Sequence, residues 1–160
     1  MRKIVLGLGI SLDGYIARPD GTLDFLFMPE DYSMAPFFAT VDTALMGRKT
    51  LDAMATYVFS RSLPAGKRDG VIFTHQSPTP LVRQLRKSKG KNIRLMGGGE
   101  LARDFLKADL VDELYIGMVP VLIGEGIPLF PPGFPQRESS LVENKTYSKG
   151  LIALKYKRNR

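Results

Sequence analysis

Two short segments of the chain combine glycine with residue types that bind phosphate. Residues 45–50 read Leu-Met-Gly-Arg-Lys-Thr, and residues 95–101 read Leu-Met-Gly-Gly-Gly-Glu-Leu. Each reads as a strand that ends in glycine and runs into a helix. The start of a helix offers unpaired N–H groups to an anion, and glycine lets an anion approach the backbone. One such turn is commonly a tight connection only, but two in one small chain predict a dinucleotide site.

Carboxylates after the first predicted strand and before the first predicted helix are candidates for proton chemistry. Asp13 follows the first predicted strand, where it could orient a polar substrate and pass a proton through water. The alternative is that Asp13 only shapes the turn before Gly14. Glu30 and Asp31 precede the first predicted helix, and they are the other candidate proton sources.

A metal site is not expected. The chain has no cysteine, so thiolate sites and disulfides are excluded, and His75 is its only histidine. His75 follows a predicted strand, which makes it either a phosphate contact or a surface residue.

Composition bounds the class of protein. The 160 residues are 44% hydrophobic and 24% charged, typical of one globular domain over residues 1–160. The net charge is +7, and residues 83–94 and 145–160 hold 12 of the 23 basic residues; neither segment contains an acid. No nucleic-acid-binding motif accompanies them, so we read them mainly as solvated surface. No stretch is long and apolar enough for a membrane span or a signal peptide, so a cytoplasmic protein is expected.

Residues 45–50 and 95–101 can share one site only if a sheet places their strand ends side by side, and the rest of the chain predicts such a sheet. Strand-like runs alternate with helical ones. The expected strands are residues 3–10, 43–46, 70–74, 93–96 and 113–119, and the expected helices are residues 33–40, 47–55, a basic helix from Ser77, and 100–107. A final pair of strands, 140–147 and 151–157, joins through Ser148, Lys149 and Gly150. This order predicts an α/β fold with a mostly parallel central sheet, helices on both faces and a C-terminal antiparallel hairpin.

The motifs in this order resemble the dihydrofolate reductase superfamily. Residues 46–50, the strand end 72–76 and residues 96–99 occur in that family's order and approximate spacing. Residues 11–17 (SLDGYIA), 110–114 (LVDEL) and 120–126 (PVLIGEG) with 128–130 are more similar to the reductase domain of the bacterial bifunctional riboflavin-biosynthesis deaminase–reductase and its stand-alone relatives. The resemblance implies a dihydrofolate-reductase-like three-layer sandwich.

The resemblance also implies roles for individual residues in binding NADPH. The backbone of Ile10 and Ser11 would lie beside the nicotinamide. Gly47, Arg48, Lys49 and Thr50 would hold the pyrophosphate, with Arg48 reaching the adenosine 2′-phosphate. The remaining cofactor residues are Thr74, His75 and Gln76 on the adenosine side, and Gly97, Gly98, Gly99, Glu100 and Leu101 over the nicotinamide–ribose and pyrophosphate.

Residue types favour NADPH over NADH. A phosphate monoester suits an arginine fork and hydroxyl donors, and no acid lies among Arg48, Lys49 and residues 74–76. An NAD-selective site would place a carboxylate there, against a free ribose hydroxyl.

The expected activity is transfer of a hydride to a small heterocyclic or carbonyl substrate, as the resemblance to the riboflavin-pathway reductase implies. Dihydrofolate reductase is the enzymatic alternative, but the position of its helix carboxylate falls near Met34 here. The alternative of another class is an NADP-binding module without turnover. Asp13 and Asp31 are the predicted catalytic residues. Among partners we expect a small-molecule substrate and a second copy of the chain, but neither nucleic acid nor membrane. The ground for the second copy is that residues 110–114 and 119–123 carry more apolar surface than one thin sheet easily covers.

Overall fold

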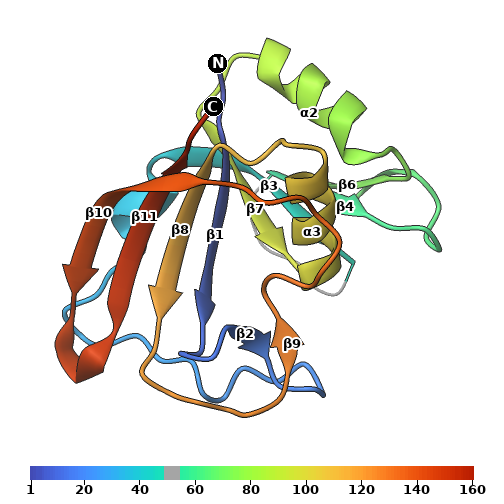
Figure 1. Ribbon diagram of the computed structural model, residues 1–160. Helices are drawn as coiled ribbons and strands as arrows, with labels where there is room; N and C mark the ends of the chain where they lie inside the picture. The colour runs from blue at the N-terminus through green and yellow to red at the C-terminus, as the bar shows by residue number, and fades with distance from the viewer. Residues whose placement is uncertain (49–54) are drawn as a thin grey trace.

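The strands of the computed structural model build one large sheet. The structure describes residues 1–48 and 55–160, and within them the sheet has nine strands in the order β10-β11-β8-β1-β7-β3-β4-β6-β5 (Figure 1). The six from β8 to β6 are mutually parallel. β11 pairs antiparallel with β8, β10 pairs antiparallel with β11, and β5 pairs antiparallel with β6. The parallel strands are β8 (Glu113–Met118), β1 (Ile4–Ile10), β7 (Asn92–Gly97), β3 (Val41–Gly47), β4 (Ala55–Phe59) and β6 (Val71–Thr74). The outer strands are β10 (Ser139–Thr146), β11 (Ile152–Arg158) and β5 (Gly66–Arg68).

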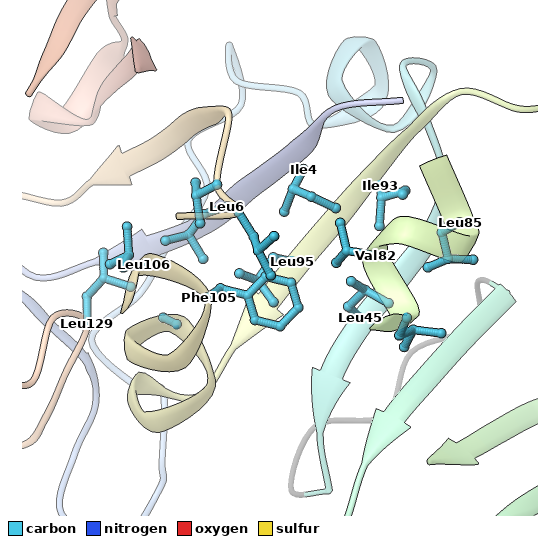
Figure 2. Packing of buried hydrophobic residues seen from close by; sticks show 14 of the residues in the cluster. Ile4, Leu6, Leu45, Val82, Leu85, Ile93, Leu95, Phe105, Leu106 and Leu129 are labelled. Carbon is cyan, nitrogen blue, oxygen red and sulfur yellow. The ribbon is translucent and has the colours of Figure 1, made fainter. Parts of the chain in front are cut away.

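The main core lies between one face of this sheet and two helices, α2 (Pro78–Lys87) and α3 (Gly99–Lys107). Alternate residues of the central strands point into it, and Figure 2 shows them meeting Val82 and Leu85 of α2 and Phe105 and Leu106 of α3. Phe105 is fully buried, so its truncation to alanine should cost about 3–5 kcal/mol. This packing fixes the positions of both helices along the strands, and it therefore also fixes where α3 begins.

The opposite face is covered by the chain between the first and third strands of the sequence. Phe37 of α1 (Ala35–Phe38) packs on Val5 and stacks on the Tyr115 ring at 4.9 Å between centroids. The same segment carries β2 (Tyr15–Ala17), which pairs with β9 (Ile127–Pro128) as a separate two-stranded sheet. The predicted α/β fold, with a mostly parallel sheet and a C-terminal hairpin, is therefore confirmed.

Three local predictions need correction. The helix expected over residues 33–40 is only Ala35–Phe38, with Met34 as its N-cap, although the Ser33 hydroxyl still accepts the Ala35 N–H. The helix expected over 47–55 falls largely on residues 49–54, outside the described residues, and Ala55 itself begins β4. Thr56, Tyr57, Val58 and Phe59 are β-branched or aromatic, which favours a strand.

The third correction concerns apolar surface. The sequence suggested that residues 110–114 and 119–123 leave apolar area for a partner copy. Instead Leu110, Val111 and Val119 are buried in their own chain. Leu122 of the second run is exposed, and so are Leu141 and Val142 on the terminal hairpin, where each side chain is about half exposed.

No helix in the described part of the chain is long and apolar enough to cross a membrane.

Candidate functional site

The predicted cofactor residues that the structure describes lie at or just after the carboxyl ends of strands in one row of five neighbours. β1, β7, β3, β4 and β6 are neighbours in that order, and they end at Ile10, Gly97, Gly47, Phe59 and Thr74. Strands are spaced about 4.8 Å apart, so these ends span roughly 19 Å. The order across the edge runs from the residues expected at the nicotinamide to those expected at the adenosine phosphate.

The two glycine motifs meet at the centre of this edge. Met46 pairs with Gly97, and a Cβ built on Gly47 would lie 4.0 Å from the Gly97 carbonyl oxygen. Gly97 has φ = +72°, a left-handed conformation that favours glycine, and the Gly97–Gly98 peptide bond is cis. The strand therefore turns sharply into α3 where the two motifs are closest.

Gly98 and Gly99 have different surroundings. Gly98 is exposed, and a Cβ there would meet no protein atom within 4 Å. At Gly99 a Cβ would lie only 2.5 Å from the Pro128 carbonyl oxygen. Gly98 thus faces open space at the mouth of the site, whereas Gly99 is fixed by packing.

The start of α3 presents its backbone to the same space. Gly98 is the N-cap, and its carbonyl accepts the first helical bond from Ala102 N–H. The N–H groups of the residues after the cap precede the helical ladder and are available to an anion. Glu100 is exposed in this first turn, where a carboxylate also suits the helix dipole, and Leu101 is half buried against the core.

One loop connects the two predicted contacts of the 2′-phosphate. Arg48 is exposed after β3 and donates to the Ser62 hydroxyl at 3.0 Å. His75 Nε2 lies within hydrogen-bond distance of the carbonyl oxygen of Leu63, the residue after Ser62. Ser60 anchors the loop, because its hydroxyl accepts the N–H groups of Ser62 and Leu63. Arg48 and His75 therefore converge on residues 60–63, which the sequence did not single out.

A hollow of about 530 Å³ opens beside this loop. Thr74, His75 and Gln76 line it, together with Tyr57 and Ile72 from the sheet and Leu81 and Gln84 from α2. Thr74 is buried, and its hydroxyl accepts the Gln76 N–H, which holds the turn after β6. The hollow is large enough for a ring, with a polar edge on the side of His75. Lys49 and Thr50, also predicted to bind the cofactor, lie outside the described residues.

Ile10 and Ser11 lie at the other end of the row, and their backbone groups already have partners. The Ile10 carbonyl accepts Val119 N–H, while Ser11 N–H donates to Tyr15 and the Ser11 carbonyl accepts Gly14 N–H. A carbonyl oxygen has two lone pairs, so the Ile10 carbonyl can accept a further hydrogen bond. The carboxamide N–H of a nicotinamide beside Ile10 could donate to that second lone pair.

Asp13 joins two loops beside Ser11. Its carboxylate accepts the Ser11 hydroxyl at 2.6 Å and the backbone N–H groups of Ile123 and Gly124. The Ser11 hydroxyl, followed by these amides, keeps the pKa of Asp13 below its usual value. Asp13 is thus a carboxylate whose oxygens are engaged by the protein itself.

The Asp31 carboxylate is also hydrogen-bonded within the protein, to Ser148, which is distant in the sequence. Its two oxygens accept the Ser148 N–H and the Ser148 hydroxyl, and these bonds lower its pKa. The neighbouring Tyr32 packs edge-on against Tyr147, with ring centroids 4.8 Å apart. The sequence reading missed Tyr32, and the only available signal was its position after the two acids.

A smaller hollow of about 250 Å³ lies at the opposite end of the sheet, between α3 and the start of β8. Its two arginines, Arg137 and Arg158, both form ion pairs with Asp109. It carries none of the predicted site residues.

Comparison with known proteins decides which family this arrangement represents. The sequence matches the RibD C-terminal domain family over residues 52–153. The chain belongs to the RibD C-terminal domain family. It is also 38% identical over 144 residues to YwjB of Bacillus subtilis (strain 168), described as an uncharacterized protein, covering 81% of this chain and 83% of YwjB.

Solved structures place this RibD-type domain in the dihydrofolate-reductase-like fold, as the sequence motifs predicted. A putative riboflavin biosynthesis protein from Shewanella sp. PV-4 superimposes with a TM-score of 0.85 and 28% identity, over 100% of both chains. A diaminohydroxyphosphoribosylaminopyrimidine deaminase/5-amino-6-(5-phosphoribosylamino)uracil reductase from Thermotoga maritima gives a TM-score of 0.77 at 14% identity. The match covers 99% of this chain and 57% of the Thermotoga protein. These likenesses show that the chain has the fold of both structures over at least 99% of its length.

Proposed function

We propose that this RibD-type domain is an NADPH-dependent reductase that transfers a hydride to a small heterocyclic or carbonyl substrate. The single observation that carries the proposal is the row of strand ends from Ile10 through Gly97 and Gly47 to Thr74. A dinucleotide laid along this row would place its nicotinamide, pyrophosphate and adenosine phosphate at residues suited to each.

The described residues fit NADPH at three points. The open space at Gly98 leaves room for phosphate or ribose against backbone, and the α3 start supplies N–H donors. Arg48 supplies a charged fork beside the loop that also contacts His75. The hollow lined by Thr74, His75 and Gln76 would take the adenosine side.

Bound NADPH would supply the hydride, and the chain has to align the substrate and provide a proton. Alignment requires rigid loops around the strand ends. Asp13 supports them by tying residues 11–13 to residues 123–124. Asp13 and Asp31, the predicted catalytic residues, remain part of the proposal. Each would place a negative charge beside the substrate or hold in position a loop that contacts it.

Spectrophotometry of NADPH oxidation tests the function. Purified protein is supplied with NADPH and one of three acceptors: 5-amino-6-(5-phosphoribosylamino)uracil, 7,8-dihydrofolate or a quinone. We expect acceptor-dependent loss of NADPH, greatest with the aminouracil. NADPH binding without oxidation by any acceptor would instead favour an NADP-binding module, and preference for dihydrofolate would favour a folate reductase.

A further inference from the structure

Three side chains of residues 26–37 cover glycines on the outer face of β1 and β8. Phe37 lies over Gly7, Leu26 over Gly9 and Tyr32 over Gly117. A Cβ on the glycine would meet the covering side chain at 2.7 Å, 3.4 Å and 4.0 Å respectively. Gly9 and Gly117 pair with each other as the penultimate residues of their strands. The packing is therefore loosest at the carboxyl edge, next to the proposed nicotinamide position.

The Tyr32 hydroxyl at this edge has two side-chain neighbours, the Met34 sulfur and Tyr115. It donates to the Met34 thioether sulfur at 2.7 Å, and sulfur is a poor hydrogen-bond acceptor. Burial raises the pKa of Tyr32 above its usual value, and the interaction with Tyr115 also raises it, so the hydroxyl keeps its proton at neutral pH. An oxygen or nitrogen acceptor on a ligand would be a better partner than the sulfur.

Contacts on both sides fix the Tyr32 ring. The backbone N–H of Tyr32 donates to the Pro29 carbonyl, and the carboxylate of the preceding Asp31 accepts two hydrogen bonds from Ser148. Tyr147, next to Ser148, packs against the ring edge. A hydroxyl held by backbone and packing in this way is preorganised for a ligand.

We infer that Tyr32 is the catalytic hydrogen-bond donor to the substrate, and this inference rests on the proposed reductase function. The substrate class is a flat ring with a C=O or C=N bond. The hydride from NADPH adds to the carbon, the C=X π electrons move to the heteroatom, and that atom takes the Tyr32 hydroxyl proton. The phenolate then regains a proton from water. An alkoxide or amide anion is more basic than a phenolate, so the transfer is favourable.

Tyr32→Phe removes the hydroxyl and keeps the ring. With the best acceptor of the three named above, we expect kcat to fall roughly 10²–10⁴-fold, the range of general acid catalysis. NADPH affinity and the melting temperature should be unchanged. Tyr156→Phe is the matched control, because Tyr156 lies on β11 beside Leu114 and away from this edge, and it should keep wild-type turnover. Turnover by Tyr32→Phe within about twofold of wild type would overturn the inference.

A second measurement does not depend on turnover. Protein labelled with ¹³C at tyrosine Cζ is saturated with NADP⁺ and titrated with each acceptor, and the Tyr32 signal is assigned by its loss in Tyr32→Phe. If wild type oxidises no NADPH, the proposed function fails for these acceptors, yet a shift of the Tyr32 signal would still support contact with the ligand. An unmoved Tyr32 signal, with every acceptor, would overturn the inference.

Discussion

The Asp31 carboxylate accepts two hydrogen bonds from Ser148, one from the backbone N–H at 2.9 Å and one from the hydroxyl at 2.6 Å. The two residues are 117 positions apart, so this contact ties the loop before α1 to the turn of the terminal hairpin. Tyr32 and Tyr147 pack together beside it. The contact makes the position of the Tyr32 hydroxyl depend on the hairpin.

The first prediction follows from this contact. Asp31→Ala and Ser148→Ala should each lower turnover while leaving NADPH affinity unchanged, since both disturb the loop that carries Tyr32. Ser148→Ala removes only the hydroxyl bond, whereas Asp31→Ala removes that bond and the backbone one, so the double variant should be no worse than Asp31→Ala alone. A double-mutant cycle in kcat measures this coupling. Additive losses would show that Asp31 acts independently of Ser148, for example as a proton source.

The second prediction concerns Asp13. Asp13→Asn nearly preserves shape and removes the charge that accepts the Ser11 hydroxyl and the loop amides. NADPH affinity should stay constant while turnover falls. Turnover equal to that of wild type in the Asn variant would reduce Asp13 to a turn residue.

The third prediction concerns acid stability and follows from the hydrogen bonds that the Asp13 carboxylate accepts. These hydrogen bonds, first of all from the Ser11 hydroxyl, hold the folded-state pKa of Asp13 below its ordinary value, so they stabilise the fold fully above that ordinary pKa. This contribution is lost as the pH falls through the lower, folded-state pKa. The melting temperatures of wild type and Asp13→Asn, followed from pH 6 downward, should therefore converge at the acid end. A constant difference across this range would contradict the assignment.

The fourth prediction separates the glycines. Gly98→Ala adds a methyl into open space, so it should weaken NADPH binding with little change in melting temperature, and Gly98→Val should abolish binding. Gly99→Ala is the control for packing, because its methyl would collide with the Pro128 carbonyl and lower the melting temperature. Full NADPH affinity in folded Gly98→Val would show that this space is not the cofactor site.

The fifth prediction concerns cofactor choice. Arg48→Ala removes a charged donor expected at the 2′-phosphate, which is worth roughly 1.5–3 kcal/mol, or about 10- to 150-fold in affinity. NADPH affinity should fall by this factor, whereas NADH affinity should hardly change. Titration of both cofactors decides the question, and equal loss for the two would refute the 2′-phosphate assignment.

The proposed homodimer has its own test. All eight residues of β10 are exposed, and this edge strand carries Leu141 and Val142. We expect sedimentation at micromolar concentration to give twice the 17.8 kDa chain mass, and Val142→Lys to shift the protein toward monomer. A wild-type protein that sediments as a 17.8 kDa monomer would rule the dimer out.

Local patterns were enough to predict most of the sheet and both long helices. The glycine motifs mark their own strand ends, and Ser77 with two prolines marks the start of α2. β4 was missed because the expected helix after Gly47 ended at its first residue, Ala55, and residues 56–59 were assigned to no element despite being β-branched or aromatic. The contacts that shape the site are another matter. Arg48 with Ser62 and Asp31 with Ser148 join residues that no local periodicity relates, and only the folded chain brings them together.

A crystal structure of the protein with NADPH tests the central claim most directly. The account predicts the nicotinamide beside Ile10 and Gly97, the pyrophosphate over Gly47 and Gly98, and the 2′-phosphate within hydrogen-bond distance of Arg48. Density for the cofactor elsewhere, such as in the hollow beside Arg137 and Arg158, or no density at saturating NADPH, would contradict it.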